Sequence, residues 1–114
     1  KVVLLATGSE VEIAVATAKA LEEQGIGADV VSLPSWAHFD AQDAAYKADI
    51  LPAGVLRASI EAGTTFGWER YTGLDGLRFG IDSFGASAPA EVLYDHFGLT
   101  AAKIAPQIKA ALGA

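Results

Sequence analysis

Four short runs rich in apolar residues recur along the chain, and each is predicted to form a strand. The first is apolar and β-branched without interruption, as strands covered on both faces usually are. The runs span Val2–Ala6, Ala28–Leu33, Val55–Glu61 and Leu77–Ile81. Pro34 stops the second run, because proline cannot donate to a strand ladder.

Helical spacing of apolar residues fills most of the chain between and after these runs. A helix is predicted from Ser9 to about Gln24, ended by Gly25. Its main apolar face contains Val11, Ala14, Val15, Ala18 and Leu21. Shorter helices are predicted over 39–51, 89–97 and 100–112. Pro106 removes one backbone hydrogen bond from the last of these, so that helix should kink or start late.

The alternation of strands and helices predicts an α/β domain. Such chains form a mainly parallel sheet with helices on both faces, a three-layer α/β/α arrangement. No repeat, linker or low-complexity tract interrupts the 114 residues, so residues 1–114 should form one domain. The sequence contains no Met and its first strand begins at Val2. From these two features we expect the chain to be a domain of a longer protein.

Composition excludes several classes of function. The formal net charge is −6, and the eight Lys and Arg residues are scattered, whereas binding to nucleic acid or an anionic membrane needs clustered cations. No apolar run approaches the roughly 18–20 residues of a membrane helix. There is no cysteine, which excludes disulfides and thiolate metal sites and leaves the compartment open.

The turn after the first strand resembles a phosphate loop but lacks its residues. Gly8 stands alone, whereas dinucleotide and phosphate loops need further glycines or a lysine. Ser9 and Glu12 have the spacing of a capping box, in which each side chain accepts a hydrogen bond from the other's backbone N–H. Glu10 adds negative charge at the start of the helix, which repels an anion. We expect this turn to bind nothing.

A crevice at the carboxyl ends of the strands is the other place where a ligand could bind. Gly8, Ser9, Glu61 and Asp82 would line it. Glu61 and Asp82 could form a carboxylate pair for acid–base or metal chemistry. We favour a structural role, in which they accept hydrogen bonds from loops, because no histidine or basic residue completes a site.

No catalytic, cofactor-binding or metal-binding residue is predicted. His38 and His96 lack the spaced partners of a metal site. Ser87 lies in Gly-Ala-Ser-Ala-Pro, which has a proline where a nucleophile elbow needs glycine, so it is interpreted as a helix cap.

Aromatic residues crowd into the glycine-rich segment 63–84, and most should belong to the core. A loop of this kind can also present aromatic anchors to a partner. The first helix carries a second apolar stripe of Ile13, Ala16 and Ala20, where a free helix should be polar. The candidate interface residues are Ile13, Phe66, Trp68 and Tyr71.

Long stretches of the sequence resemble the C-terminal domain of transketolase. They include LLATGSEVEIAVATAKALEEQGIGADVVSLPS, FDAQDAAYKADILP and EAGTTFGWERYTGLDGLRFGIDSFGASAPAEVLYDHFGLT. The segment FGASAPAEVLYDHFGLT separates transketolase from deoxyxylulose-phosphate synthase and from the β subunit of pyruvate dehydrogenase. For the fold, the resemblance implies parallel strands in the order 2-1-3-4, with the family's leading antiparallel edge strand missing.

The resemblance also implies a function for the intact enzyme. It would be a cytoplasmic homodimer of the pentose phosphate pathway that moves two-carbon ketol units between sugar phosphates. Thiamine diphosphate and Mg²⁺ or Ca²⁺ would bind between the two preceding domains, and none of the family's cofactor or substrate residues maps onto this chain. The chain itself would be an inactive assembly domain, whose partners are the preceding domains and a second subunit.

Two alternatives stay open beside this hypothesis. A small-ligand or regulatory domain would use the crevice near Gly8, Glu61 and Asp82. A receiver-like or flavin-binding protein would also fit the strand order. A receiver, however, needs an acidic pair after its first strand, and a flavin-binding protein needs a Ser/Thr-rich phosphate loop; the sequence has neither.

Overall fold

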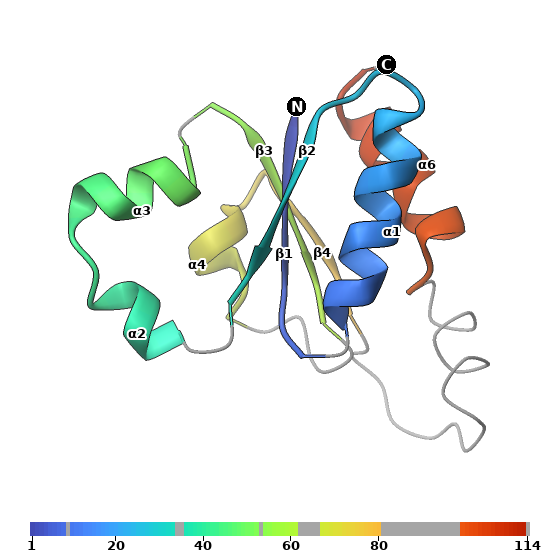
Figure 1. Ribbon diagram of the computed structural model, residues 1–114. Coiled ribbons are helices and arrows are strands. Elements are labelled where there is room, and N and C mark those ends of the chain that lie inside the picture. The colour runs from blue at the N-terminus through green and yellow to red at the C-terminus, as the bar shows by residue number, and fades with distance from the viewer. Residues whose placement is uncertain (9, 34–35, 53, 62–66, 81–98, 114) are drawn as a thin grey trace.

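A four-stranded parallel sheet forms the centre of the molecule (Figure 1). The computed structural model describes residues 1–8, 10–33, 36–52, 54–61, 67–80 and 99–113. The strands are β1 (Val2–Ala6), β2 (Ala28–Ser32), β3 (Leu56–Ile60) and β4 (Leu77–Phe79). Their order is β2-β1-β3-β4, and each adjacent pair is parallel. The predicted α/β class and strand order are confirmed.

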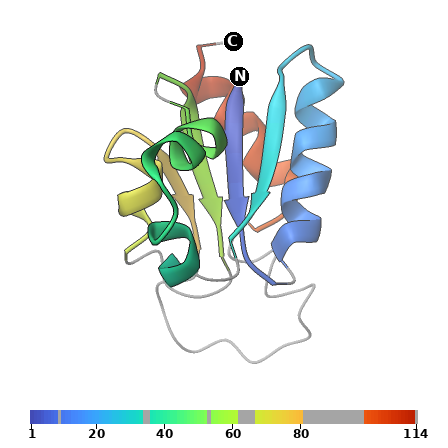
Figure 2. The same ribbon diagram turned by 60° about the vertical axis from the view of Figure 1, so that its left-hand side comes forward.

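Helices cover both faces of this sheet (Figures 1 and 2). One face is covered by α1 (Glu10–Glu22) and α6 (Ala101–Ala111). The other is covered by α2 (Trp36–Asp40), α3 (Ala44–Ile50) and α4 (Glu69–Thr72). The carboxyl ends of the strands point to the end of the molecule opposite the N-terminus (Figure 1).

Strand β1 divides the interior into two apolar clusters, because its successive side chains point to opposite faces. Val2, Leu4 and Ala6 pack with α1 and α6, while Val3 and Leu5 pack toward α2, α3 and α4. All five residues of β1 are fully buried, as its continuous apolar sequence predicts for a strand covered on both sides. In register, Val3 of β1 lies opposite Arg57 of β3.

Helix α1 buries the predicted residues Ala14, Ala18 and Leu21, with Val11 partly buried, and differs from the prediction at Val15. Val15 was assigned to the core but is 54% exposed, whereas Thr17 is fully buried. Thr17 can be buried because its hydroxyl donates to the Ile13 carbonyl oxygen at 2.8 Å, so its polar atom is satisfied. Ile13 and Ala20 of the second stripe are partly buried against the cluster that includes α6, and Ala16 is exposed. This chain's own last helix therefore covers part of that stripe.

The other helices differ from their predicted bounds in three ways. The single helix predicted over 39–51 is two helices, because the Asp43 carboxylate accepts from the Tyr46 N–H at 2.8 Å and starts α3 anew. Helix α6 starts at Ala101 and continues through Pro106, so the late start was wrong, and the alternative of a kink stays a prediction. Pro106 lies on the exposed side, where water can solvate the carbonyl that loses its donor. Helix α4 was not predicted. The helix predicted over 89–97 falls outside the described residues.

Gly76, in the turn between α4 and β4, is required by space. A Cβ atom at this position would lie 2.7 Å from the Arg57 carbonyl oxygen and would also collide with the backbone of Thr72. We predict that Gly76→Ala lowers the free energy of unfolding by about 2–3 kcal/mol and Tm by roughly 8 °C or more. Thermal unfolding followed by circular dichroism measures this.

Gly27→Ala is the matched control. A Cβ at Gly27 meets nothing closer than the Lys1 side chain at 3.8 Å, so Tm should change by no more than about 2 °C. Equal Tm values for the two variants would contradict the close approach of β3 to this turn.

Candidate functional site

The carboxyl ends of β1 and β3 are joined by a hydrogen bond between side chains. The Thr7 hydroxyl donates to the Glu61 carboxylate, and the Glu61 N–H donates to the Phe79 carbonyl oxygen at 3.0 Å. Gly8 follows Thr7 with a φ of +56°, which favours glycine. Glu61 thus accepts a hydrogen bond, which is the structural role favoured for it from the sequence. Ser9 and Asp82 lie outside the described residues, so the capping box and the carboxylate pair stay predictions.

Two of the predicted interface residues are core residues instead. Trp68 and Tyr71 are each 3% exposed and belong to the apolar cluster beneath α2, α3 and α4. Their rings are covered because α2 packs onto them. The prediction that Trp68 and Tyr71 anchor a partner at the surface is therefore wrong, because both side chains lie in the interior. Phe66 lies outside the described residues, and Ile13 is partly buried as noted above.

Edge-to-face aromatic contacts join α2 to α4. The ring of Trp36 lies 5.0 Å from that of Trp68 and 5.2 Å from that of Tyr71, both with T-shaped geometry. Phe39 meets Tyr71 in the same way at 5.7 Å. Such pairs contribute roughly 0.5–1.5 kcal/mol each beyond their buried area. Gly67 lies close beneath Trp36, where a Cβ would approach the indole at 3.2 Å.

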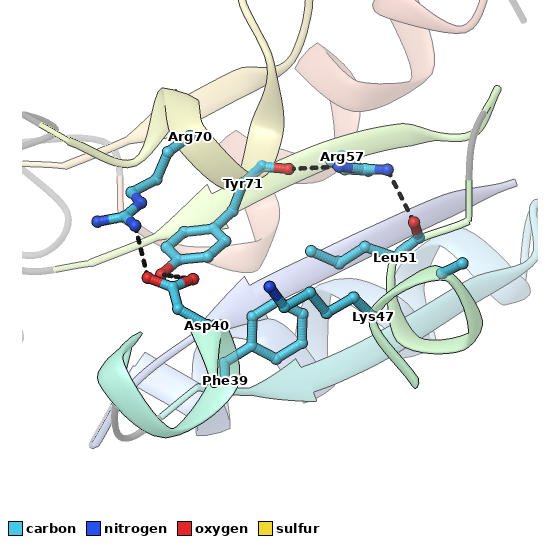
Figure 3. A pocket seen from close by; sticks show the side chains of 8 residues that line it. Phe39, Asp40, Lys47, Leu51, Arg57, Arg70 and Tyr71 are labelled. Carbon is cyan, nitrogen blue, oxygen red and sulfur yellow. Dashed lines mark hydrogen bonds and ion pairs between the residues drawn. The ribbon is translucent and has the colours of Figure 1, made fainter. Parts of the chain in front are cut away.

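A polar network closes over these rings and is centred on Asp40, at the end of α2. The carboxylate accepts from the Arg70 guanidinium at 2.5 Å and from the Tyr71 hydroxyl at 3.1 Å (Figure 3). The Arg70 guanidinium also lies 5.8 Å from the Trp36 ring centre and 5.4 Å from that of Tyr71. Burial, helped by the hydrogen bond to Asp40 and its charge, raises the pKa of Tyr71 to about 12.

Arg57 connects the sheet to two helix ends. Its guanidinium donates to the carbonyl oxygens of Tyr71 at 2.9 Å, Leu51 at 2.8 Å and Pro52 at 3.2 Å. These carbonyls end α4 and α3, where backbone acceptors lack helical partners. One half-buried side chain from β3 therefore holds both helices against the sheet (Figure 3).

A pocket of about 500 Å³ lies between these groups. It is lined by Phe39, Asp40, Lys47, Ala48, Leu51, Arg57, Arg70 and Tyr71. In Figure 3 the Lys47 side chain extends from α3 into the space bounded by Asp40, Tyr71 and Leu51. The Lys47 ammonium makes no hydrogen bond or ion pair with any part of the chain that the structure describes.

The lining residues were not identified from the sequence. Two signals were present: Arg57 interrupts an apolar strand, where a buried charge needs partners, and Arg70 lies among aromatic residues. No sequence feature marks Asp40 and Lys47 as pocket residues, because charged residues are common at the exposed positions of short helices.

The pocket offers space and charged groups, but few groups for catalysis. Within the described ranges no three His, Asp or Glu side chains could hold a metal ion. Asp40, the carboxylate of the pocket, is already paired with Arg70 and Tyr71.

Among the described residues, no helix is long and apolar enough to cross a membrane.

The raised pKa of Tyr71 predicts a change in stability at alkaline pH. An unfolded tyrosine ionises near pH 10 while the folded one keeps its proton to about pH 12, so folding loses stability as pH rises between these values. Tyr71→Phe removes this contribution. Below pH 9 the variant should be less stable by about 1 kcal/mol, because the hydrogen bond to Asp40 is lost.

Urea unfolding at a series of pH values compares the two proteins. The native chain should lose more stability than Tyr71→Phe between pH 10 and 12, by at most about 1.4 kcal/mol per pH unit. Tyr46→Phe is the control, because Tyr46 is exposed, and should follow the native chain. Parallel curves for native protein and Tyr71→Phe would contradict the buried hydroxyl.

Comparison with known proteins agrees with this fold. The model of the transketolase-like TK C-terminal domain family matches residues 1–100. The plasmid-encoded transketolase of Cupriavidus necator is 58% identical over 105 residues, which are 92% of this chain and 16% of that protein. The chloroplastic transketolase of Solanum tuberosum is 49% identical over 109 residues, 95% of this chain and 15% of the relative.

Solved structures of transketolases have the same domain. The Pichia stipitis transketolase, solved in complex with sedoheptulose-7-phosphate, superposes with a TM-score of 0.90 at 41% identity. That match covers 98% of this chain and 16% of the Pichia chain. The chain thus spans about 16% of the length of such relatives. With its parallel sheet, its strand order and its match over residues 1–100, the chain belongs to the transketolase-like C-terminal domain family.

Proposed function

We propose that this chain is the non-catalytic assembly domain of a transketolase. The observation that carries the proposal is the family match over residues 1–100, together with the fold shared with transketolase structures. The full-length enzyme would transfer two-carbon ketol units between sugar phosphates as a cytoplasmic enzyme of the pentose phosphate pathway. This chain would supply none of the reacting groups.

The described ranges hold no cluster of acidic or histidine side chains for the cation that accompanies thiamine diphosphate. Thiamine diphosphate is held through Mg²⁺ or Ca²⁺, and hard cations of this kind need several oxygen ligands. No group of three acidic or histidine side chains within those ranges could supply them. The resemblance to transketolase supports binding of the cofactor and metal to the preceding domains, and no step of the reaction is assigned to this chain.

The proposed partners are the preceding domains of the same polypeptide and a second subunit of a homodimer. The outward face of α1 is a suitable contact surface, because Val15 is 54% exposed and Ala16 is exposed beside it. Packing of such apolar side chains against a neighbouring domain is favourable. Ile13 would contribute from the edge of the same helix, and Phe66 stays a predicted contact.

A second candidate function is a small-ligand or regulatory domain that uses the crevice beside Gly8, Glu61 and Asp82. The Thr7–Glu61 hydrogen bond holds a carboxylate at this crevice. A carboxylate there disfavours an anionic ligand, because like charges repel. The assembly role is therefore preferred.

The purified chain should show no ketol transfer with thiamine diphosphate, Mg²⁺ and a pair of sugar phosphates. A coupled spectrophotometric assay measures this, with an intact transketolase as positive control. Turnover above the enzyme-free blank that follows chain concentration would contradict the proposal, because it would place reacting groups in this domain.

A further inference from the structure

The pocket between α2, α3 and α4 carries a charge opposite to that of the chain as a whole. The chain has a formal net charge of −6, with 8 Lys and Arg against 14 Asp and Glu. The pocket, by contrast, is lined by three cationic side chains and a single carboxylate, that of Asp40. A concave surface of one sign concentrates counter-ions, here anions.

The cations differ in how far they are already occupied. Arg70 is paired with Asp40, and the Arg57 guanidinium donates hydrogen bonds to three backbone carbonyl oxygens. Lys47 has no partner among the described residues and extends into the pocket (Figure 3). Its ammonium is thus the group available for a charge-assisted hydrogen bond to a ligand.

The carboxylate of Asp40 does not cancel this preference. One of its oxygens accepts from Arg70 and the other from the Tyr71 hydroxyl, so its negative charge is balanced by the guanidinium of Arg70. The positive potential of the pocket therefore comes from Lys47 and Arg57, whose charges no carboxylate of the lining balances.

The size and remaining lining of the pocket indicate an organic molecule. Its volume of about 500 Å³ exceeds what a bare phosphate ion needs and lies in the range of small-molecule sites. Phe39, Ala48 and Leu51 supply apolar surface for a carbon skeleton beside the cations.

From this geometry we propose that the pocket binds a small organic anion, with the Lys47 ammonium contacting its phosphate or carboxylate oxygens. The site is distinct from the crevice at the carboxyl ends of the strands and does not depend on the assembly role. Arg57 and Arg70 hold the pocket walls, Arg57 adds positive charge, and Lys47 determines affinity.

Binding can be followed by intrinsic fluorescence, because the chain has two tryptophans, Trp36 and Trp68, and both pack against Tyr71 of the pocket wall. The chain is titrated with glycerol 3-phosphate and with succinate at constant ionic strength, and with glycerol as the neutral control. Saturable binding of one or both anions, without binding of glycerol, is expected. The two anions together decide whether phosphate or carboxylate is preferred.

Lys47→Met should weaken the binding of the preferred anion about tenfold or more, and Lys47→Arg should restore most of it. Lys19→Met, on α1 across the sheet, removes the same charge elsewhere and should leave the affinity within about twofold. Circular dichroism and Tm confirm that the variants are folded.

Three outcomes would overturn the proposal. Neither anion binds up to about 20 mM, well above the Kd of a millimolar site; Lys47→Met leaves binding unchanged; or Lys19→Met weakens it as much as Lys47→Met does. The last result would mean that net charge alone attracts the anion. None of these outcomes bears on ketol transfer, so the assembly role is tested separately.

Discussion

The guanidinium of Arg57 holds one of the two helical layers in place. It originates on β3, a strand paired on both sides, and it reaches backbone carbonyls at the ends of α3 and α4. Removing part of a charged group from water is costly unless hydrogen bonds compensate, and three carbonyl acceptors do so for the half-buried Arg57. Charge-assisted hydrogen bonds of this kind contribute about 1.5–3 kcal/mol each, more than neutral ones.

The two layers of helices are consequently held in different ways. On the α1 and α6 side, apolar side chains such as Leu21, Ile104 and Ile108 pack directly onto the sheet. On the other side an apolar cluster also packs onto the sheet, but the short helices depend in addition on the polar groups of Asp40, Arg57 and Arg70. Short helices are marginal by themselves, so tertiary contacts must fix them. Because some of those contacts are made by charged side chains, this layer also contains a basic pocket.

The sequence determined the sheet far better than it determined this pocket. Runs such as Val2–Ala6 are apolar without interruption, and that pattern suits few structures other than a buried parallel strand. One part of α1 was harder to predict, because Thr17 is buried with its hydroxyl bonded to the Ile13 carbonyl oxygen, while Val15 is exposed. Residues of the pocket come from three helices and a strand, and their pairing depends on how the short helices dock. Asp40 and Arg70 are 30 positions apart, and local patterns carry no information about such a contact.

Hydrogen–deuterium exchange on the Arg57→Met variant tests most directly whether Arg57 holds this layer. Methionine keeps the apolar stem but leaves the carbonyls of Leu51, Pro52 and Tyr71 without their donor. The amides of α3 and α4 should exchange at least about tenfold faster than in the native chain, while α1 and α6 keep their protection. Unchanged exchange in α3 and α4, or an equal loss of protection in all helices, would contradict the account.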